Sequence, residues 1–425
     1  MKATVAAGIG IVGLVVAMFS LNGAQATSQL DRAPRTEPIR SPAEPPSGLL
    51  SLDDLTYQGA IRVSPEESNG EGFSYGGQTM AYNPAANTLF VGSLHGKVAE
   101  ISIPEPVKAN VLDQLPIASV VQPFYDPAEG RLRDIAEDGV NLSGLLVHEG
   151  RLYGNGLIYY DAGNAQRRSH FGRSLDLART NEVTRMYQVG ENGKSGFVAG
   201  YMANVPQEWR AALGGPAVTG QCCVSIISRT SFGPALFAWN PAELERRDQV
   251  PATPLLYYTQ EHATLGTWEG ANEMYGGTTT VAGVAIIDRT RTVLFAGRNG
   301  MGPFCYGEGV DDQQKAKETR PGGEKYCYDP TSRDKGQHAF PYRLQFWAYD
   351  LNDLAAVKAG DKDPWEVRPY GVWPFELPPI GDPHPRLGAM AYDPARRRIF
   401  ITQMYGEKNG YALRPIVHVY TVRER

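Results

Sequence analysis

Short apolar segments joined by polar turns recur along most of the chain. Met80–Ala85 (MAYNPA) reappears as Met390–Ala395 (MAYDPA), and Leu89–Val91 reappears as Ile399–Ile401 at the same spacing. Two further copies of the pattern occupy residues 145–153 and 284–296. In each copy, apolar and β-branched residues flank a polar turn, which predicts a β-strand, a turn and a second β-strand.

An alternating apolar and polar segment follows each repeat and predicts a third strand. Such segments lie at residues 98–103, 172–177, 235–239, 344–349 and 417–422. All but the last are followed by one more extended segment, at residues 118–124, 184–189, 254–259 and 365–373. The last is at the C-terminus, whereas an unmatched strand, Leu55–Val63, precedes the first repeat.

The pattern therefore predicts an all-β fold with five sets of four strands. We interpret it as a five-bladed β-propeller, closed by an N-terminal strand that completes the last blade. A closed ring pairs or shelters the edges that a row of sheets leaves open. The alternative, a β-sandwich with repeated hairpins, does not explain why the orphan strand and the missing strand lie at opposite ends. Aromatic residues at the matched second-strand position are expected in the core: Phe90, Tyr153, Phe295 and Phe400.

The N-terminus predicts export. Lys2 precedes an apolar stretch, Val5–Leu21, and the small residues Ala24 and Ala26, which together are typical of a signal peptide cleaved after residue 26. An uncleaved membrane anchor is the alternative. Residues 27–50 are rich in proline and predict an extended linker. The propeller domain is expected over residues 51–425, in a secreted or periplasmic protein with no membrane contact after cleavage.

The net charge and residue composition exclude some classes of binding partner and cofactor. The 425 residues carry a formal net charge of −5 and contain no block of basic residues, so neither nucleic acid nor an anionic membrane is an expected partner. The 47 Gly, 31 Pro and 22 Tyr suit an all-β chain with many turns. The seven histidines show no metal-ligand spacing, so no metal or other cofactor is expected.

Long loops mark the face of a propeller that carries function. The longest are expected at residues 203–221 in blade three and 299–340 in blade four. Two of these loops share a motif, Arg229–Pro234 (RTSFGP) and Arg298–Pro303 (RNGMGP). Two arginines at equivalent strand ends could form an anion clamp, with Asn299 beside it, or each could hold its own Gly-Pro turn.

The same loops combine aromatic rings with polar groups, a mixture that suits carbohydrate and equally suits a protein interface. Candidate ligand-binding rings are Tyr159, Tyr160, Trp268 and Tyr306. Glu269 and Glu273 are weak candidates for acid or base chemistry, and His170 is a further one because two arginines precede it.

Four cysteines in an exported chain are expected to be oxidised. Cys305 and Cys327 bracket the charged middle of the blade-four loop, which favours a disulfide between them. Cys222 and Cys223 then pair with each other or cross to the blade-four cysteines. The residues do not decide between these pairings.

In its repeats and its strand exchange, the chain resembles the five-bladed β-propeller class, which includes secreted glycosidases with three carboxylates on the inner strands. The inner strands here carry Met80, Val147, Val284 and Met390, so no catalytic residue is carried over. The leading hypothesis is a secreted protein that binds an extracellular ligand, a carbohydrate or other anionic small molecule, on its loop-rich face. The alternatives are a carbohydrate-active enzyme, either a glycoside hydrolase or a uronate lyase, and a structural surface protein with a protein partner.

Overall fold

The predicted repeats form the inner two strands of antiparallel sheets, and the alternating segments add the outer strands. A computed structural model describes residues 48–191, 194–223, 229–258, 265, 267–269, 272–320 and 322–424. Blades one and two contain β2 (Met80–Asn83), β3 (Thr88–Gly92), β4 (Val98–Ser102), β5 (Val120–Tyr125), β6 (Val140–His148), β7 (Arg151–Ile158) and β8 (His170–Ser174).

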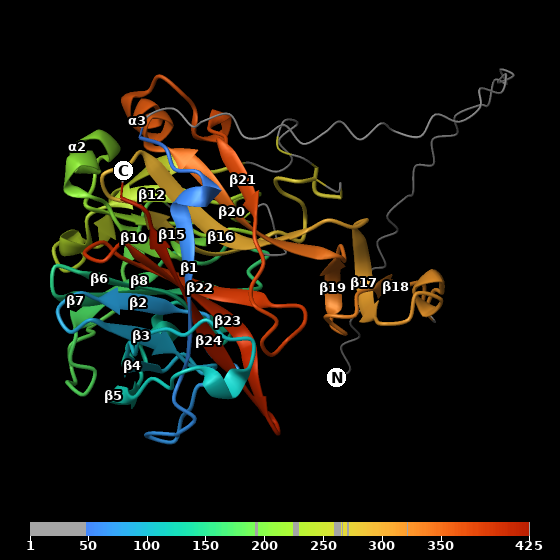
Figure 1. The fold of residues 1–425 in the computed structure, drawn as a ribbon. Coiled ribbons are helices and arrows are strands. Elements are labelled where there is room, and N and C mark those ends of the chain that lie inside the picture. Colours follow the sequence, from blue (N-terminus) through green and yellow to red (C-terminus); the bar gives the residue numbers. More distant parts are fainter. Residues whose placement is uncertain are drawn as a thin grey trace, which may run out of the picture. The chain divides into compact units, whose positions relative to one another are not determined.

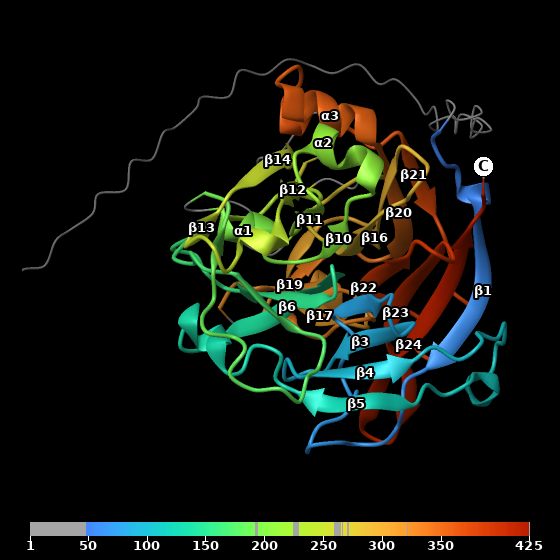
Figure 2. The same ribbon diagram turned by 90° about the vertical axis from the view of Figure 1, so that its left-hand side faces the viewer.

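Blades three to five continue the same order from the innermost strand outwards. Their strands are β10 (Met202–Asn204), β11 (Ala217–Thr219), β12 (Leu236–Trp239), β14 (Ala252–Leu256), β15 (Thr280–Ile286), β16 (Thr292–Gly300), β20 (Tyr342–Asp350), β21 (Gly371–Pro374), β22 (Arg386–Asp393), β23 (Arg398–Asn409), β24 (Ala412–Val422) and β1 (Leu55–Arg62). Figure 2 shows the five sheets following one another around a central axis. The predicted five-bladed β-propeller is confirmed.

Rings at the matched second-strand position hold neighbouring blades together. Phe90, Phe295 and Phe400 are fully buried and Tyr153 is nearly so. Phe400 of blade five stacks against Tyr82 of blade one, with 5.9 Å between ring centroids. The prediction that these four rings belong to the hydrophobic core is confirmed.

The ring is closed by antiparallel pairing of β1 with β24. Tyr57 lies opposite Tyr420, and Arg62 lies opposite Ile416. Figure 2 shows β1 beside β24 at the edge of blade five. At one end of this seam, Arg62 donates two hydrogen bonds to Glu407, of 2.6 and 3.2 Å. The N-terminal strand therefore completes the last blade, as predicted.

Two predicted segments differ from the structure. The fourth strand expected at residues 184–189 makes only one bridge to blade two, between Tyr187 and His170, and β9 (Gln188–Val189) pairs instead with β13 (Gln249–Val250). The insertion expected at residues 203–221 contains most of β10 and all of β11. Those inner strands are too short to show an alternating pattern, which is why their sequence resembled a loop.

The blade-four insertion is a small sheet of its own. It lies between β16 and β20 in the sequence, and its central strand β17 (Cys305–Val310) pairs with β18 (Lys325–Tyr328) on one side and β19 (Lys335–His338) on the other. Figure 1 shows this sheet projecting from the propeller. Cys305 and Cys327 form a disulfide with 5.7 Å between Cα atoms, which joins β17 to the parallel strand β18.

In the described part of the chain, three short α-helices lie in connections between strands: α1 (Ser195–Val198), α2 (Arg210–Leu213) and α3 (Leu351–Ala359). No helix in the described ranges is long and apolar enough to cross a membrane. The predicted signal peptide and the linker up to residue 47 lie outside the described residues. The end of that linker is already part of the fold, because Leu50 is fully buried and its amide donates to Thr292.

Two buried histidines make stability depend on pH. Burial lowers the pKa of both His170 and His418 to about 3, compared with about 6.5 in an unfolded chain. Their contribution to stability is complete above pH 6.5 and is lost as the pH falls towards 3, because only the unfolded chain takes up these protons in that interval. We expect the free energy of unfolding to rise between pH 4 and 6.5. The slope of this rise with pH should correspond to the uptake of up to about two protons on unfolding, one for each histidine. Denaturant titrations at several pH values measure this slope.

The hydrogen bonds of His418 show why its protonation would destabilise the fold. Its Nδ1 accepts from the Tyr57 hydroxyl at 3.1 Å, while its Nε2 donates to Gln403 at 2.9 Å. A second proton would make Nδ1 a donor to the Tyr57 oxygen and would place a positive charge inside the closing seam, where both ring nitrogens are buried. The variant His418→Gln should lower the slope by about one proton, and an unchanged slope would contradict this account.

Candidate ligand-binding pocket

A polar cavity of about 400 Å³ lies among loops from four of the five blades. We call it the polar pocket. It lies at the start of two innermost strands, where β15 contributes Thr280 and β22 contributes Arg386. Other lining residues come from the blade-two loop, from blade three and from the blade-four insertion: Tyr159, Tyr160, Cys223, Arg298, Tyr306, Asp329, Lys335, His338 and Tyr342.

Arg298, near the end of β16, is the central cation of the polar pocket. Its guanidinium carbon lies 3.9 Å from the centre of the Tyr342 ring, a close cation–π contact. Its Nη1 is buried and has no hydrogen-bond partner among the described residues. Burial lowers the pKa of Arg298 to about 10, so the group still carries its charge at neutral pH. The side chain as a whole is half-buried and lines the pocket, so an anionic ligand there would lie close to its charge.

Tyr342 is held in place by Asp329. The hydroxyl donates to Asp329 Oδ2 at 2.7 Å and accepts from the Ala339 amide at 3.3 Å. Burial raises the pKa of Tyr342 to about 12, so the hydroxyl stays protonated. The Tyr342 ring, against which the Arg298 guanidinium packs, therefore has a fixed orientation.

Asp329 is almost fully buried and holds the neighbouring side chains of the polar pocket in position. It accepts from His338 Nδ1 at 2.8 Å and from the Thr331 amide and hydroxyl. Burial by itself would raise the pKa of Asp329, but the hydrogen bonds from His338, Thr331 and Tyr342 outweigh it and hold the pKa well below its ordinary value. Because all these bonds use the ionised form, Asp329 is a structural carboxylate and not a proton donor.

Arg386 is the second arginine of the polar pocket. It is close enough to Arg298 for its charge to lower the pKa of Arg298 further, and its Nη2 donates to the Thr331 carbonyl at 2.5 Å. Three exposed tyrosines lie around this pair, with exposed fractions of 53% for Tyr159, 73% for Tyr160 and 57% for Tyr306. The arrangement combines a pair of cations with aromatic faces open to solvent.

Arg229, predicted as the clamp partner of Arg298, has a structural role. Its side chain is 1% exposed, with Nη1 3.5 Å from Asp161, and its Nη2 donates to the Tyr159 carbonyl at 3.1 Å. Burial lowers the pKa of Arg229, and the Asp161 carboxylate opposes this. Arg229 therefore fixes the loop that carries Tyr159 and does not itself line the polar pocket.

Asn299 is also structural. It is fully buried, accepts from Thr279 Oγ1 at 2.7 Å and donates to the Asn272 carbonyl at 2.6 Å. Trp268 is partly buried between Phe232 and Phe304. Neither side chain is placed to contact a ligand in the polar pocket.

The predicted acid and base candidates do not come together. Glu269 and Glu273 are exposed, and neither lines the polar pocket. His170 is fully buried, with its ring 4.9 Å from Trp239 and its Nε2 3.1 Å from Thr219 Oγ1. Because its ring packs inside the core against Trp239 and Thr219, His170 has no access to a substrate.

The cysteines form two disulfides, Cys305–Cys327 and the adjacent pair Cys222–Cys223. The crossed pairing between blades is therefore not the one adopted. Cys223 lines the polar pocket, so the adjacent pair lies at its wall. Among the described residues, no group of three or more His, Cys, Asp or Glu side chains is placed to hold a metal ion.

Sequence reasoning missed Arg386, Asp329 and Tyr342. Arg386 begins β22 directly after the His384-Pro385 segment, and Asp329 follows the second cysteine of the insertion. The only signal for Asp329 was its proximity to the expected Cys305–Cys327 disulfide, and nothing in the sequence analysis pointed to Arg386. Nothing in the local pattern places a residue of blade five beside one of blade four.

Comparison with known proteins does not identify a family. No protein-family model matches the sequence, and no curated protein matches it. Similar solved structures include a mutant α-L-arabinanase from Cellvibrio cellulosa, with 11% identity over 81% of this chain and 90% of that chain and a TM-score of 0.41. A GH43 endo-arabinanase from Bacillus licheniformis has 9% identity over 83% of this chain and 96% of that one, with a TM-score of 0.40. An exo-1,5-α-L-arabinanase from a bovine ruminal metagenomic library has 9% identity over 84% and 95%, with a TM-score of 0.41. The fold assignment rests on the strand pairing described above, and these similarities carry no argument about activity.

Proposed function

We propose that the protein binds an acidic carbohydrate in the polar pocket. The observation that carries this proposal is the charged, half-buried Arg298 side chain in the wall of the pocket, next to Arg386. Carboxylate and sulfate groups match the planar donor set of arginine. Because the pocket is ringed by exposed tyrosines, the rest of the ligand would stack its apolar faces on aromatic rings while its hydroxyls meet polar groups.

A binding role agrees better with the pocket than hydrolysis does. Of the carboxylates that line the described part of the pocket, Asp329 is committed to structural hydrogen bonds and Asp334 is exposed. Glycoside hydrolysis needs two free carboxyl groups on either side of the scissile bond. The inner strands, where glycosidases of this architecture carry three carboxylates, have methionine and valine at Met80, Val284 and Met390.

The proposal includes export of the chain, supported by its two disulfides, which form and persist in oxidising compartments. A signal peptide cleaved after residue 26 would deliver the propeller to such a compartment.

Calorimetric titration tests the proposal, using a galacturonate tetramer and, as the matched neutral ligand, a galactose tetramer. We expect saturable one-to-one binding of the acidic tetramer that weakens as salt is added, because screening reduces the attraction between its carboxylates and the arginine pair. The galactose tetramer should bind at least tenfold more weakly. Equal affinity for both, or no binding of either, would refute the proposal, and release of new reducing ends would make the protein an enzyme.

A further inference from the structure

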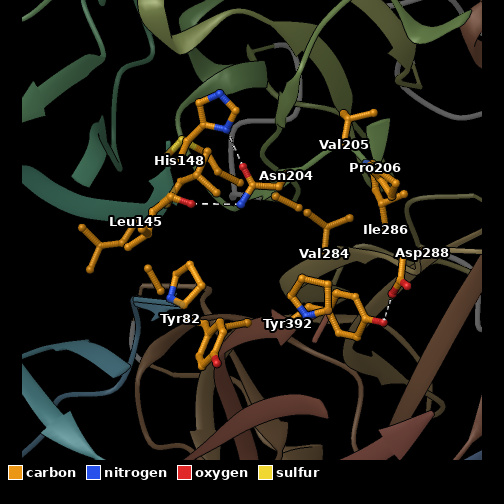
Figure 3. Close-up of a pocket in the computed structure, with 18 of the residues that line it drawn as sticks. Tyr82, Leu145, His148, Asn204, Val205, Pro206, Val284, Ile286, Asp288 and Tyr392 are labelled. Atoms are coloured by element: carbon orange, nitrogen blue, oxygen red, sulfur yellow. Dashed lines mark hydrogen bonds between the residues drawn. The ribbon is translucent and has the colours of Figure 1, made fainter. Parts of the chain in front are cut away.

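The central channel offers no path to a sugar chain that starts in the polar pocket. Four buried side chains from four blades line a recess of only about 10 Å³ in the channel: Met80, Leu145, Met202 and Met390. The cavity at the far end of the channel is lined mainly by apolar groups, among them Leu145 and Val284 (Figure 3). Sugar hydroxyls and carboxylates would find few hydrogen-bond partners there. A ligand longer than the polar pocket therefore has to continue across the face that holds the pocket.

Blade five provides a surface next to the polar pocket on this face. Arg386, which lines the pocket, is paired with Met404 in the ladder between β22 and β23, and the next residue along β23 is Tyr405. Paired Cα atoms in an antiparallel ladder are about 5 Å apart, so the backbone of Tyr405 lies within about 10 Å of that of Arg386. Tyr405 is thus a close neighbour of the arginine pair.

A smaller recess of about 80 Å³ adjoins the polar pocket on the side of blade five. Arg298 and Tyr342 line both spaces, and residues 383–385 form another wall of the recess. The segment that contains these residues also packs against β23. A Cβ atom added to Gly381 would lie 1.9 Å from the Gly406 carbonyl oxygen, so the two backbones are in close contact. Residues in contact with one another therefore connect the polar pocket with the neighbourhood of Tyr405.

Three tyrosines lie together at this end of blade five. The rings of Tyr75 and Tyr405 are 5.9 Å apart in an edge-to-face arrangement, and the Tyr75 hydroxyl donates to the Tyr411 carbonyl at 3.1 Å. Tyr75 is 37% exposed, Tyr411 is 97% exposed and Tyr405 is partly exposed. We call these three residues the tyrosine platform. Aromatic rings that reach solvent suit the apolar faces of sugar rings.

Two residues of the tyrosine platform have a backbone conformation that favours glycine. The φ angles of Tyr75 and Tyr405 are 58° and 59°. Bulky residues seldom adopt this left-handed conformation, and such costly conformations are concentrated at ligand-binding and catalytic sites. Full burial of the rings does not offset the cost, because both remain at least partly exposed. The backbone therefore points to a role for these rings at the surface.

The hairpin that carries Tyr405 and Tyr411 presents no free carboxylate to an anionic chain. Its only acidic residue, Glu407, is 2% exposed and pairs with Arg62 and Arg414. Lys408, near the tip of the hairpin, is exposed. The charge of this surface is therefore compatible with an acidic polysaccharide.

We propose that the tyrosine platform binds the sugars of an acidic polysaccharide that extend beyond the polar pocket, so that the ligand is a polymer and not a single sugar. This inference rests on the proposed function. Arg298 and Arg386 attract an acidic unit in the pocket, and the sugars that follow stack on the platform. Because stacking does not depend on charge, the contribution of the platform should not weaken as salt is added.

Calorimetry with a galacturonate dimer and a galacturonate hexamer tests the proposal. A hexamer has about five positions at which two successive units could fill the pocket, so about a fivefold gain in affinity is expected without any platform. The wild-type protein should bind the hexamer at least about 20-fold more tightly than the dimer, because stacking adds to this gain. The double variant Tyr75→Gly/Tyr405→Gly should retain only the fivefold gain, with its affinity for the dimer unchanged. Glycine adopts the left-handed backbone without strain, so this variant should fold, as a melting curve would show.

Asn87→Gly is the matched control. Asn87 has a φ of 53°, but it lies in the turn between β2 and β3, next to the strand end whose Tyr82 lines the far cavity of the channel. This variant should keep the full gain for the hexamer. A full gain that persists in the double variant, or that disappears as salt is added, would overturn the platform.

The two oligomers also separate the platform from the polar pocket. If Arg298→Met weakens binding of the dimer but the double variant keeps the full gain for the hexamer, the pocket stands and the platform is refuted. If Arg298→Met leaves binding of the dimer unchanged while the double variant loses the gain, the platform stands and the pocket is refuted. No binding of either oligomer by the wild-type protein would refute both.

Discussion

Replacing Arg298 with methionine is expected to lower the affinity for an acidic oligosaccharide by about 10- to 100-fold. A hydrogen bond to a charged partner contributes about 1.5–3 kcal/mol, and about 1.4 kcal/mol corresponds to a tenfold change in affinity. Methionine keeps much of the side-chain length but removes both the charge and the donors. The stability of the folded protein should change little, because the substitution also removes a half-buried cation whose Nη1 has no hydrogen bond among the described residues. Calorimetry and thermal melting measure the two quantities.

Arg333→Met is the matched control for this experiment. Arg333 belongs to the same blade-four insertion, but its side chain is 74% exposed and pairs with Asp311. Its loss should change affinity less than twofold, since exposed ion pairs contribute little. Affinity that is unchanged in Arg298→Met, or reduced equally in both variants, would show that the arginine pair does not bind the ligand.

Placing a charge on the buried face of the closing strand is expected to unfold the propeller. Ile61 on β1 is fully buried and packs in the core that joins blades five and one. Aspartate at this position would bury an unpaired carboxylate in an apolar cluster, and Ile61→Asp should lower the free energy of unfolding by more than about 4 kcal/mol. Chemical denaturation followed by far-ultraviolet circular dichroism measures the change.

Thr56→Asp on the same strand provides the comparison. Thr56 pairs with Thr421 in the same ladder, and its side chain is exposed. The substitution therefore keeps the backbone pairing and places the new carboxylate in solvent. We expect a change within about 0.5 kcal/mol. A folded Ile61→Asp variant with near wild-type stability would mean that β1 is not required to close the ring.

The architecture could be predicted because it depends on local patterns. The repeat of Met80–Ala85 at Met390–Ala395 marks equivalent strands, and the absence of a strand after Val422 matches the extra strand before Met80. Strand pairing follows from such alternation, since one face of every strand must be buried. The prediction failed where the pattern was too short, as at β10 and β11, whose three residues each carry little periodicity.

The site was only partly predictable, as the two arginine motifs show. Arg229 and Arg298 stand in nearly the same local sequence, but Asp161 is within reach of the first, and the Tyr342 ring lies under the second. Of the candidate rings, Tyr159, Tyr160 and Tyr306 line the polar pocket, whereas Trp268 packs into the core. A strand-end motif specifies the position of the backbone but not the direction or the partners of the side chain.

By itself, the sequence determined the number of blades, the closing strand and the long blade-four insertion, because periodic burial and turn chemistry act between neighbouring residues. Only the tertiary structure decided that Arg386 of blade five lies beside Arg298 of blade four and that His170 is buried. These are contacts between residues far apart in the chain, and they depend on the curvature of the ring and the packing of its blades. No local pattern encodes that geometry.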